Sequence, residues 1–246
     1  MNDFEDFTIG DENANEIIGA ELADTIVGLS GDDTLFGGLN DDILSGNAGL
    51  DSLAGGEGND LIVAGRDGDN ASGGADNDII AGNLGSDTLS GDEGDDLILG
   101  GQDADVLIGG VGNDTLSGDF GVNVLKGDEG ADVFIVRTDV ALSDPNRLPS
   151  SSQFRTDVIV DFDGTADKIA LTDGLTESDV ALTVTQLPTQ LVEPLFQSGE
   201  QLSDVNLDPN NDGLVDATFV QIPDGPVLAL MFNVTSADLT GNFISI

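Results

Sequence analysis

A nine-residue period governs the first half of this 246-residue chain. Residues 10–135 fall into 14 rows of nine with no insertion. Position one is glycine in every row except that of Ala64, and position six is Asp in every row except those of Asn15 and Asn123. Position eight is Ile, Leu or Phe in every row except that of Ala71. Three positions held in phase over so many rows predict a solenoid, because each row repeats one backbone path.

The residue types indicate where the backbone turns. Glycine tolerates positive φ, and position four is glycine in eight rows and mostly Asn or Asp elsewhere. We expect positions one to six to form a turn, and positions seven to nine to form a short strand with its middle side chain inward. Two rows then complete a coil, and seven coils stacked about 4.8 Å apart give a roll roughly 34 Å long.

Stacking brings the position-six carboxylates together. Two bare carboxylates about 4.8 Å apart repel by about 3–4 kcal/mol at an effective dielectric constant of 20, so the column needs a cation. Carboxylate and carbonyl oxygens suit Ca²⁺ better than Mg²⁺, which demands a tight octahedron. The alternative is a metal-free solenoid whose Asp residues cap turn amides, a role open to the Asn, Ser and Thr that position six nearly excludes. The predicted ligands are Asp24, Asp33, Asp42, Asp51, Asp60, Asp69, Asp78, Asp87, Asp96, Asp105, Asp114 and Asp132.

Composition excludes several classes of function. The formal net charge of −42 opposes binding to nucleic acid or anionic lipid, which are recognised largely through Lys and Arg. The chain has no His, Cys, Tyr or Trp, so it offers no thiolate metal site, no His-based zinc site and no Ser-His-Asp triad. The acidic N-terminus has no apolar core of a signal peptide, and no apolar run is long enough to span a membrane. We therefore expect a protein that is not an enzyme.

The rows resemble the RTX, or haemolysin-type, nonapeptide G-G-x-G-x-D-x-U-x, in which U is a large apolar residue. The rows at 55–63 and 109–117 match it in full. The resemblance implies an all-β fold, a right-handed parallel β-roll with at most 12 Ca²⁺ ions bound between stacked turns (two edges of seven turns, 6 + 6). It also implies that turn carbonyls complete the sites, among them those of Gly56, Gly58, Gly110 and Gly112.

Departures from the repeat set limits on the sites. Asn15 and Asn123 lack the position-six charge, so we expect the strongest sites between Asp33 and Asp114 and weaker ones at the ends. Three position-four residues either add a carboxylate ligand or simply accommodate the turn: Asp67, Asp76 and Asp103.

The outward positions differ between alternate rows. Even rows place Ile43, Leu61, Ile79 and Leu97 in one ladder, whereas odd rows place Thr34, Ser52, Asn70 and Thr88 in the other. An exposed apolar ladder of this size is a liability or an interface. We expect the C-terminal region or a second copy of the chain to cover it; the alternative is the ordinary β-propensity of Ile, Leu and Val.

Three domains follow: a lead-in at 1–9, the roll at 10–135 and a C-terminal β region at 136–246. Residues 139–156 read as a loop, and later apolar runs at 157–162, 168–171, 180–185, 217–222 and 227–232 predict a small antiparallel unit that caps the roll. The stretch at 161–169 is similar to a segment that follows the repeats in many secreted RTX proteins. A second metal loop, like that of an EF-hand but without its final Glu, has the candidate ligands Asp208, Asn210, Asp212 and Asp216; the alternative is a simple acidic turn.

The expected function is calcium binding by a secreted or cell-surface protein whose roll folds on binding Ca²⁺ outside the cell. The resemblance implies type I secretion through an uncleaved C-terminal signal, with the type I secretion machinery as a partner. The alternative is an adhesion or surface-assembly module that uses the apolar ladder. Ice binding is weaker, since position three shows no regular Thr row.

Overall fold

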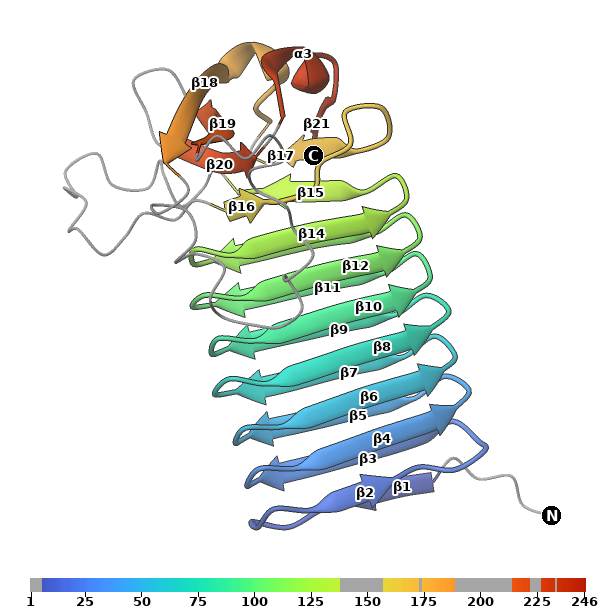
Figure 1. Ribbon diagram of the computed structural model, residues 1–246. Coiled ribbons are helices and arrows are strands. Elements are labelled where there is room, and N and C mark those ends of the chain that lie inside the picture. Colours follow the sequence, from blue (N-terminus) through green and yellow to red (C-terminus); the bar gives the residue numbers. More distant parts are fainter. Residues whose placement is uncertain (1–5, 138–156, 173, 189–213, 222–226, 233) are drawn as a thin grey trace.

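A parallel β-solenoid of about seven turns spans residues 7–135, and a smaller region with antiparallel strands closes its C-terminal end (Figure 1). The computed structural model describes residues 6–137, 157–172, 174–188, 214–221, 227–232 and 234–246. Strand β1 (Asp6–Ile9) lies at the opposite end of the roll from the C-terminus. The predicted β-roll is thus confirmed.

Successive strands alternate between two sheets, here called sheet I and sheet II. Sheet I contains β1, β3 (Asp24–Ser30), β5 (Ile43–Ala48), β7 (Leu61–Arg66), β9 (Ile79–Leu84), β11 (Leu97–Gln102), β13 (Thr115–Phe120), β15 (Val133–Val136), β17 (Lys168–Leu171) and β21 (Phe243–Ser245), in that spatial order. Sheet II contains β2 (Glu16–Ile18), β4 (Thr34–Leu39), β6 (Ser52–Glu57), β8 (Asn70–Ala75), β10 (Thr88–Glu93), β12 (Val106–Val111), β14 (Val124–Glu129), β16 (Asp157–Ile159), β20 (Val227–Phe232), β19 (Leu214–Gln221) and β18 (Ala181–Pro188).

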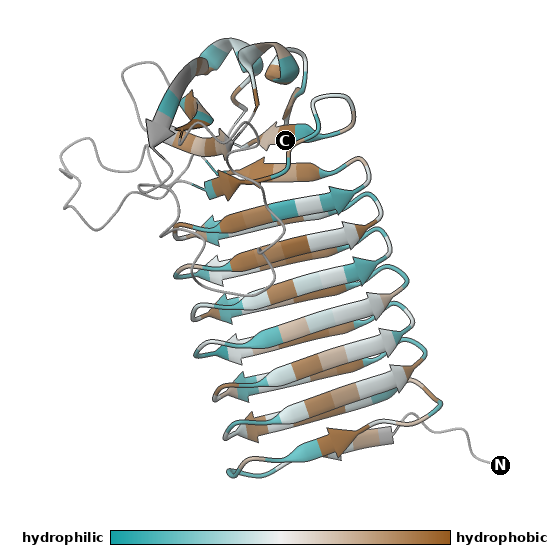
Figure 2. Ribbon diagram, viewed as in Figure 1, coloured by the Kyte–Doolittle hydropathy of each residue, from teal (hydrophilic) through white to brown (hydrophobic). Residues whose placement is uncertain are grey.

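The core between the sheets is built from position eight, as predicted. Leu44 pairs in register with Ile62, and Ile62 with Ile80, each 18 residues along the chain. These side chains are fully buried, and the apolar segments lie within the strands (Figure 2). Ala71, the small residue of the series, is buried in the same cluster.

The turns are shorter than we predicted. Each strand of the repeats runs through positions seven to nine and on into positions one to three of the next row, as in Ile43–Ala48. Only positions four to six form the turn. Position four takes the left-handed conformation, with φ of 134° at Gly49 and 74° at Asp67. Position-one glycines such as Gly46 lie inside a strand and are not among the residues with positive φ. The interpretation of position one as a turn glycine was therefore wrong.

The C-terminal region continues the roll before it caps it. Strands β16 and β17 pair in parallel with β14 and β15, so one further coil is stacked on the last repeat. Phe162, between them, packs against Phe134 with ring centroids 6.1 Å apart. Strands β18, β19 and β20 form the antiparallel part, and a short 3₁₀ helix (Glu177–Asp179) and α3 (Ser236–Leu239) complete the end.

The predicted C-terminal strands and their small antiparallel region are confirmed, in β18, β19 and β20. Two of the predicted strands, β16 and β17, are parallel additions to the roll. The loop predicted at 139–156 lies outside the described residues. None of the described helices is long and apolar enough to cross a membrane.

The apolar ladder has the predicted register, because Ile43, Leu61, Ile79 and Leu97 are successive partners in sheet I. Ile43 and Ile79 are each 45% exposed and Leu61 is 38% exposed, so the part of the chain that the structure describes leaves this ladder open to solvent. The described strands of the C-terminal region extend the two sheets and do not cover it, and cover by a second copy of the chain stays a prediction. The covered outer positions are on sheet II, where Val106, Ile108 and Val124 are buried in a cluster with Val158, Val160, Val215 and Ala217.

Truncation of one core residue tests how far the roll depends on this packing. Leu89 is fully buried, so Leu89→Ala should destabilise the protein by about 2–5 kcal/mol. Leu84, in the same row but 39% exposed, is the matched control, and Leu84→Ala should change stability by less than about 0.5 kcal/mol. Denaturant unfolding in saturating Ca²⁺ measures both, and equal losses would contradict this account of the core.

Candidate metal sites

The position-six side chains lie within the edges of the roll. We call the turns that lead into sheet I the even edge, with Asp24, Asp42, Asp60, Asp78, Asp96, Asp114 and Asp132, and those that lead into sheet II the odd edge, with Asn15, Asp33, Asp51, Asp69, Asp87, Asp105 and Asn123. Every one of these Asp residues is 4% exposed or less. Two neighbours on one edge, a coil apart, are here called a rung.

Each rung is held by the same hydrogen bonds. The backbone N–H of Asp60 donates to Oδ1 of Asp78 at 2.7 Å, and the N–H of Asp78 donates to Oδ1 of Asp96 at 2.7 Å. The N–H of Ile79 donates to the carbonyl of Asp60 at 2.9 Å. One carboxylate oxygen of each Asp therefore binds the preceding coil, which fixes the side chain inside the edge.

The second carboxylate oxygen has no such partner. Among the described residues, eleven buried Oδ2 atoms accept no hydrogen bond: those of Asp33, Asp42, Asp51, Asp60, Asp69, Asp78, Asp87, Asp96, Asp105, Asp114 and Asp132. A buried acceptor left unpaired costs about 1–3 kcal/mol, and more when it is charged. Asp24, at the N-terminal end, differs, since its Oδ2 accepts from the N–H of Ala20 at 2.7 Å.

Burial also disfavours the charge on these groups. Loss of solvation, with further repulsion from neighbouring carboxylates, raises the pKa of Asp60 and Asp132 to about 6 and that of Asp78 and Asp114 to about 7. The metal-free column is therefore under electrostatic stress that a bound cation would relieve.

The position-one glycine makes room for oxygen atoms. A Cβ added at Gly46 would meet Oδ2 of Asp51 and would lie 2.6 Å from the carbonyl oxygen of Ala64, one coil on. The same pair of oxygens faces Gly82, from Asp87 and Gly100. Glycine at these two positions leaves open a space that one carboxylate and one carbonyl oxygen line, whereas Ala64 places a Cβ at the same position of its row.

These features fit a hard cation. In the described part of the chain, no group of three or more acidic side chains is arranged to hold a metal ion by itself. Each rung of two Asp residues instead offers two carboxylates, and carbonyl oxygens must supply the other ligands, as Ca²⁺ accepts. The unpaired Oδ2 atoms, and the carbonyl oxygens that line the spaces beside the position-one glycines, are the oxygen atoms that would bind the cation.

The predicted carbonyl ligands belong to strand ends and turns with positive φ. Gly110 and Gly112 have φ of 117° and 148°, and the carbonyl oxygens of Asp92 and Gly94 pack against them from the preceding coil. Gly56 and Gly58 also have positive φ, 123° and 127°. Their role as calcium ligands stays a prediction.

The position-four acids take the left-handed conformation of the glycines they replace. Asp67, Asp76 and Asp103 have φ between 74° and 78°, and their side chains are exposed. The structure thus places them in the turn and does not bury their carboxylates with the column.

The second candidate loop is described at one residue. Asp216 lies in β19, a strand, and its Oδ1 accepts from Nε2 of Gln186 at 2.9 Å. Asp208, Asn210 and Asp212 lie outside the described residues.

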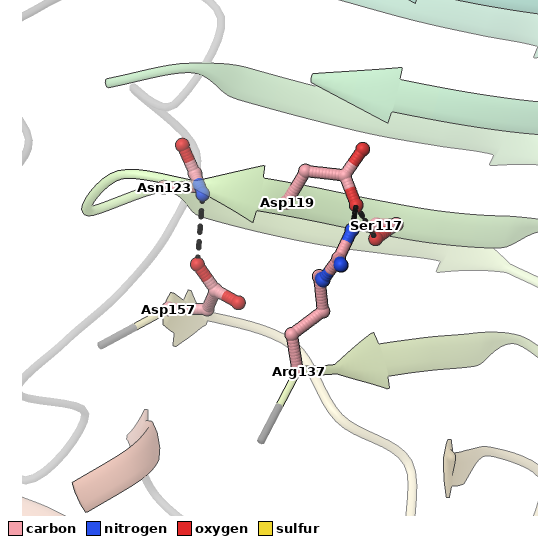
Figure 3. Close-up of polar contacts among 5 residues, drawn as sticks. All are labelled: Ser117, Asp119, Asn123, Arg137 and Asp157. Carbon is pink, nitrogen blue, oxygen red and sulfur yellow. Dashed lines mark hydrogen bonds and ion pairs between the residues drawn. The ribbon is translucent and has the colours of Figure 1, made fainter. Parts of the chain in front are cut away.

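The sequence pattern did not identify Asp157 and Asp167 as members of the position-six column. The N–H of Asp132 donates to Oδ1 of Asp167 at 3.0 Å, and Nδ2 of Asn123 donates to Oδ1 of Asp157 at 2.9 Å (Figure 3). Both edges therefore continue into the C-terminal coil. The signal was present in Asp157-Val-Ile-Val and Asp167-Lys-Ile-Ala, which repeat positions six to nine. Asp157 follows its partner by 34 residues and Asp167 by 35, so neither fits the nine-residue period.

A second ladder distinguishes the even edge. At position five, Asn59 donates its N–H to Asp41, Asn77 to Asn59, Asp95 to Asn77, Asn113 to Asp95 and Ala131 to Asn113, at 2.7–3.3 Å. On the odd edge, within the described residues, one bond of this kind occurs, from Leu50 to Asp32 at 2.9 Å. The even-edge turns are thus linked by bonds that need no metal.

Fold and site together define a β-roll built to bind cations along its two edges. The family model of the RTX calcium-binding nonapeptide repeat matches residues 9–44, 18–53, 36–71, 72–107 and 99–134, which together cover about half of the chain. The chain belongs to this family of RTX repeat proteins, whose repeats bind Ca²⁺. A search of curated proteins found no match.

The raised pKa values predict how the metal-free roll responds to pH. The folded chain holds protons on Asp60, Asp78 and Asp114 up to pH about 6–7, whereas the unfolded chain loses them near the ordinary value of 3.8. The stability of the metal-free roll should therefore fall as pH rises from about 4 to 7.

Urea unfolding of metal-free protein at intervals from about pH 4 to pH 7 measures this effect, and the midpoint should fall as pH rises and be lost near neutral pH. About 1 M KCl shortens the Debye length to about 3 Å and suppresses repulsion between the exposed acids, so the buried column dominates. A midpoint that rises with pH would contradict the prediction.

Proposed function

We propose that this protein is a secreted calcium-binding protein whose roll folds when Ca²⁺ binds outside the cell. The observation that carries the proposal is the set of buried, unpaired Oδ2 atoms on both edges. Without a cation the folded state must keep these carboxylates apart or protonated, which opposes folding near neutral pH.

The difference in Ca²⁺ concentration between the inside and the outside of a cell would control whether the roll is folded. Each site that binds only the folded chain stabilises it by RT ln(1 + [L]/Kd), about 1.4 kcal/mol at tenfold excess over Kd. With affinities typical of extracellular modules, about 10⁻⁴–10⁻³ M, the sites fill outside a cell and stay empty inside. Several such sites then decide whether the roll is folded.

The proposal that the protein is secreted rests on its membership of the RTX repeat family. RTX repeat proteins are typically secreted. An unfolded acidic chain that folds on meeting Ca²⁺ suits type I export and a secreted or cell-surface location.

We assign no catalytic role. The sequence has no His or Cys for a general base, nucleophile or zinc site, and the buried acids belong to the rungs. Binding of calcium is thus proposed as the activity, not a step towards chemistry.

Circular dichroism during a Ca²⁺ titration tests the proposal. At about pH 8 the chelated protein should lack a cooperative β signal, Ca²⁺ should restore it, EDTA should reverse it, and Mg²⁺ should fail to replace Ca²⁺. A cooperative β fold in EDTA would overturn the calcium switch.

Two matched variants test whether the position-six carboxylates are the groups that bind Ca²⁺. Asp78→Asn removes one charge from two rungs and should move the Ca²⁺ midpoint about tenfold higher, or about 1.4 kcal/mol. Glu57→Gln removes the same charge from an exposed side chain and should leave the midpoint nearly unchanged. Equal shifts would mean that overall charge, not the column, controls binding.

A second candidate function is self-association in Ca²⁺, as in surface assembly or adhesion. The exposure of Ile43, Leu61 and Ile79 in one in-register ladder favours it, because a second copy would remove this surface from water. Leu61→Ser with Leu97→Ser should then abolish association, whereas Thr34→Ser with Thr88→Ser on sheet II should not. Sedimentation in Ca²⁺ distinguishes the two, and a monomeric parent protein would exclude this candidate.

A further inference from the structure

The two edges of the roll end differently. On the odd edge the last two partners are Asn123 and Asp157, an amide and a carboxylate. On the even edge they are Asp132 and Asp167, two carboxylates. Both pairs lie at the junction between the last repeats and the C-terminal coil, and Asp157 and Asp167 fall outside the residues that the family model matches.

The odd end is closed by hydrogen bonds alone. Oδ1 of Asn123 accepts from the N–H of Asp105 at 3.0 Å, and its Nδ2 donates to Asp157 at 2.9 Å (Figure 3). The amide nitrogen thus supplies a donor where an Asp would present a second negative oxygen. Nearby, Asp119 accepts from Nη1 of Arg137 at 3.0 Å, so this end also carries a cationic side chain (Figure 3).

The even end repeats the bonding of the calcium rungs. The N–H of Asp132 donates to Oδ1 of Asp167 at 3.0 Å, and the N–H of Lys168 donates to the carbonyl of Asp132 at 2.8 Å. These are the two bonds that join Asp114 to Asp132 one coil earlier, at 2.9 and 2.8 Å. A gap of 35 residues therefore yields the geometry that 18 residues yield in the repeats.

One oxygen at this junction has no partner. Asp132 is 1% exposed, and its Oδ2 accepts no hydrogen bond. Asp167 is 3% exposed, and its Oδ2 accepts from the N–H of Asp163 at 2.7 Å, just as Asp24 accepts from Ala20 at the first rung of this edge. Asp167 therefore ends the column, while Asp132 still presents an open oxygen.

Negative charge gathers around that oxygen. Asp161 takes the place of a position-one glycine, and its carboxylate accepts from the N–H groups of Gly127 and Asp128 at 2.9 and 2.8 Å. Lys126 pairs with Asp128 at 2.8 Å, and the ammonium of Lys168 donates to Asn242. The carboxylates of Asp161 and Asp167 repel that of Asp132, and Lys126 and Lys168 offset part of this negative charge at Asp161 and Asp167.

We propose that a Ca²⁺ ion binds between Asp132 and Asp167 and joins the C-terminal coil to the last repeat, whereas on the odd edge the amide of Asn123 takes the place of a metal. This inference rests on the proposed calcium binding and adds a site outside the repeats. It makes attachment of the C-terminal coil dependent on calcium along one edge and independent of it along the other.

Native mass spectrometry in Ca²⁺ tests the site by counting ions. Asp167→Asn should lose one ion relative to the parent protein, and its far-UV signal should stay the same because the amide oxygen can still accept from the N–H of Asp132. Asp157→Asn, the matched change on the odd edge, should lose none. An unchanged count in Asp167→Asn, or a loss of one ion in both variants, would overturn the proposal.

Asn123→Asp is the converse variant. It tests the junction site even if Asp167→Asn does not fold. Replacing the amide by a carboxylate should add at least one ion on the odd edge, and no gain would overturn the proposal. A parent protein that binds no Ca²⁺ would refute the proposed function itself. Calcium binding by the parent with no change in these variants would refute only the junction site.

Discussion

The structure depends on the stacking of buried carboxylates at intervals of one coil. The residues at position eight form the apolar core, and each coil also brings a new Asp into an edge where its side chain is buried. In the eleven column residues from Asp33 to Asp132, one oxygen of each Asp is bound by the preceding backbone, and the other is open. The fold thus combines apolar packing that favours the roll at any pH with an ionic column that opposes it until protons or cations arrive.

Much of the fold and of the candidate metal sites can be predicted from the nine-residue rows of the sequence. The solenoid, the inward position eight and the position-six column follow from residues such as Leu44, Ile62 and Asp78, because a strict period leaves each residue type a single place in the coil. Position one was misinterpreted because glycine can mark either a positive φ or a lack of space. Gly46 is glycine for the second reason, and the sequence alone cannot separate the two.

The C-terminal coil was harder to predict for a different reason. Asp157 and Asp167 carry the local pattern of the repeat, but the insertions before them break the period by which the pattern is recognised. The covered patch on sheet II was missed in a similar way. Val106 and Val124 depart from the polar residues of earlier odd rows, a change that a pattern taken from rows three to nine does not include. Long-range pairing, not local preference, decides both features.

The position-five ladder gives the roll a mechanical asymmetry. Along the even edge, five backbone amides are held by side chains of the preceding coil, while the described part of the odd edge has one such bond. If the carboxylates of both edges repel one another equally, the coils separate more easily on the odd side. The even edge then acts as a fixed hinge, and the coils separate first along the odd edge. Each Ca²⁺ ion that binds on the odd edge holds two coils together against an even edge that hydrogen bonds already join.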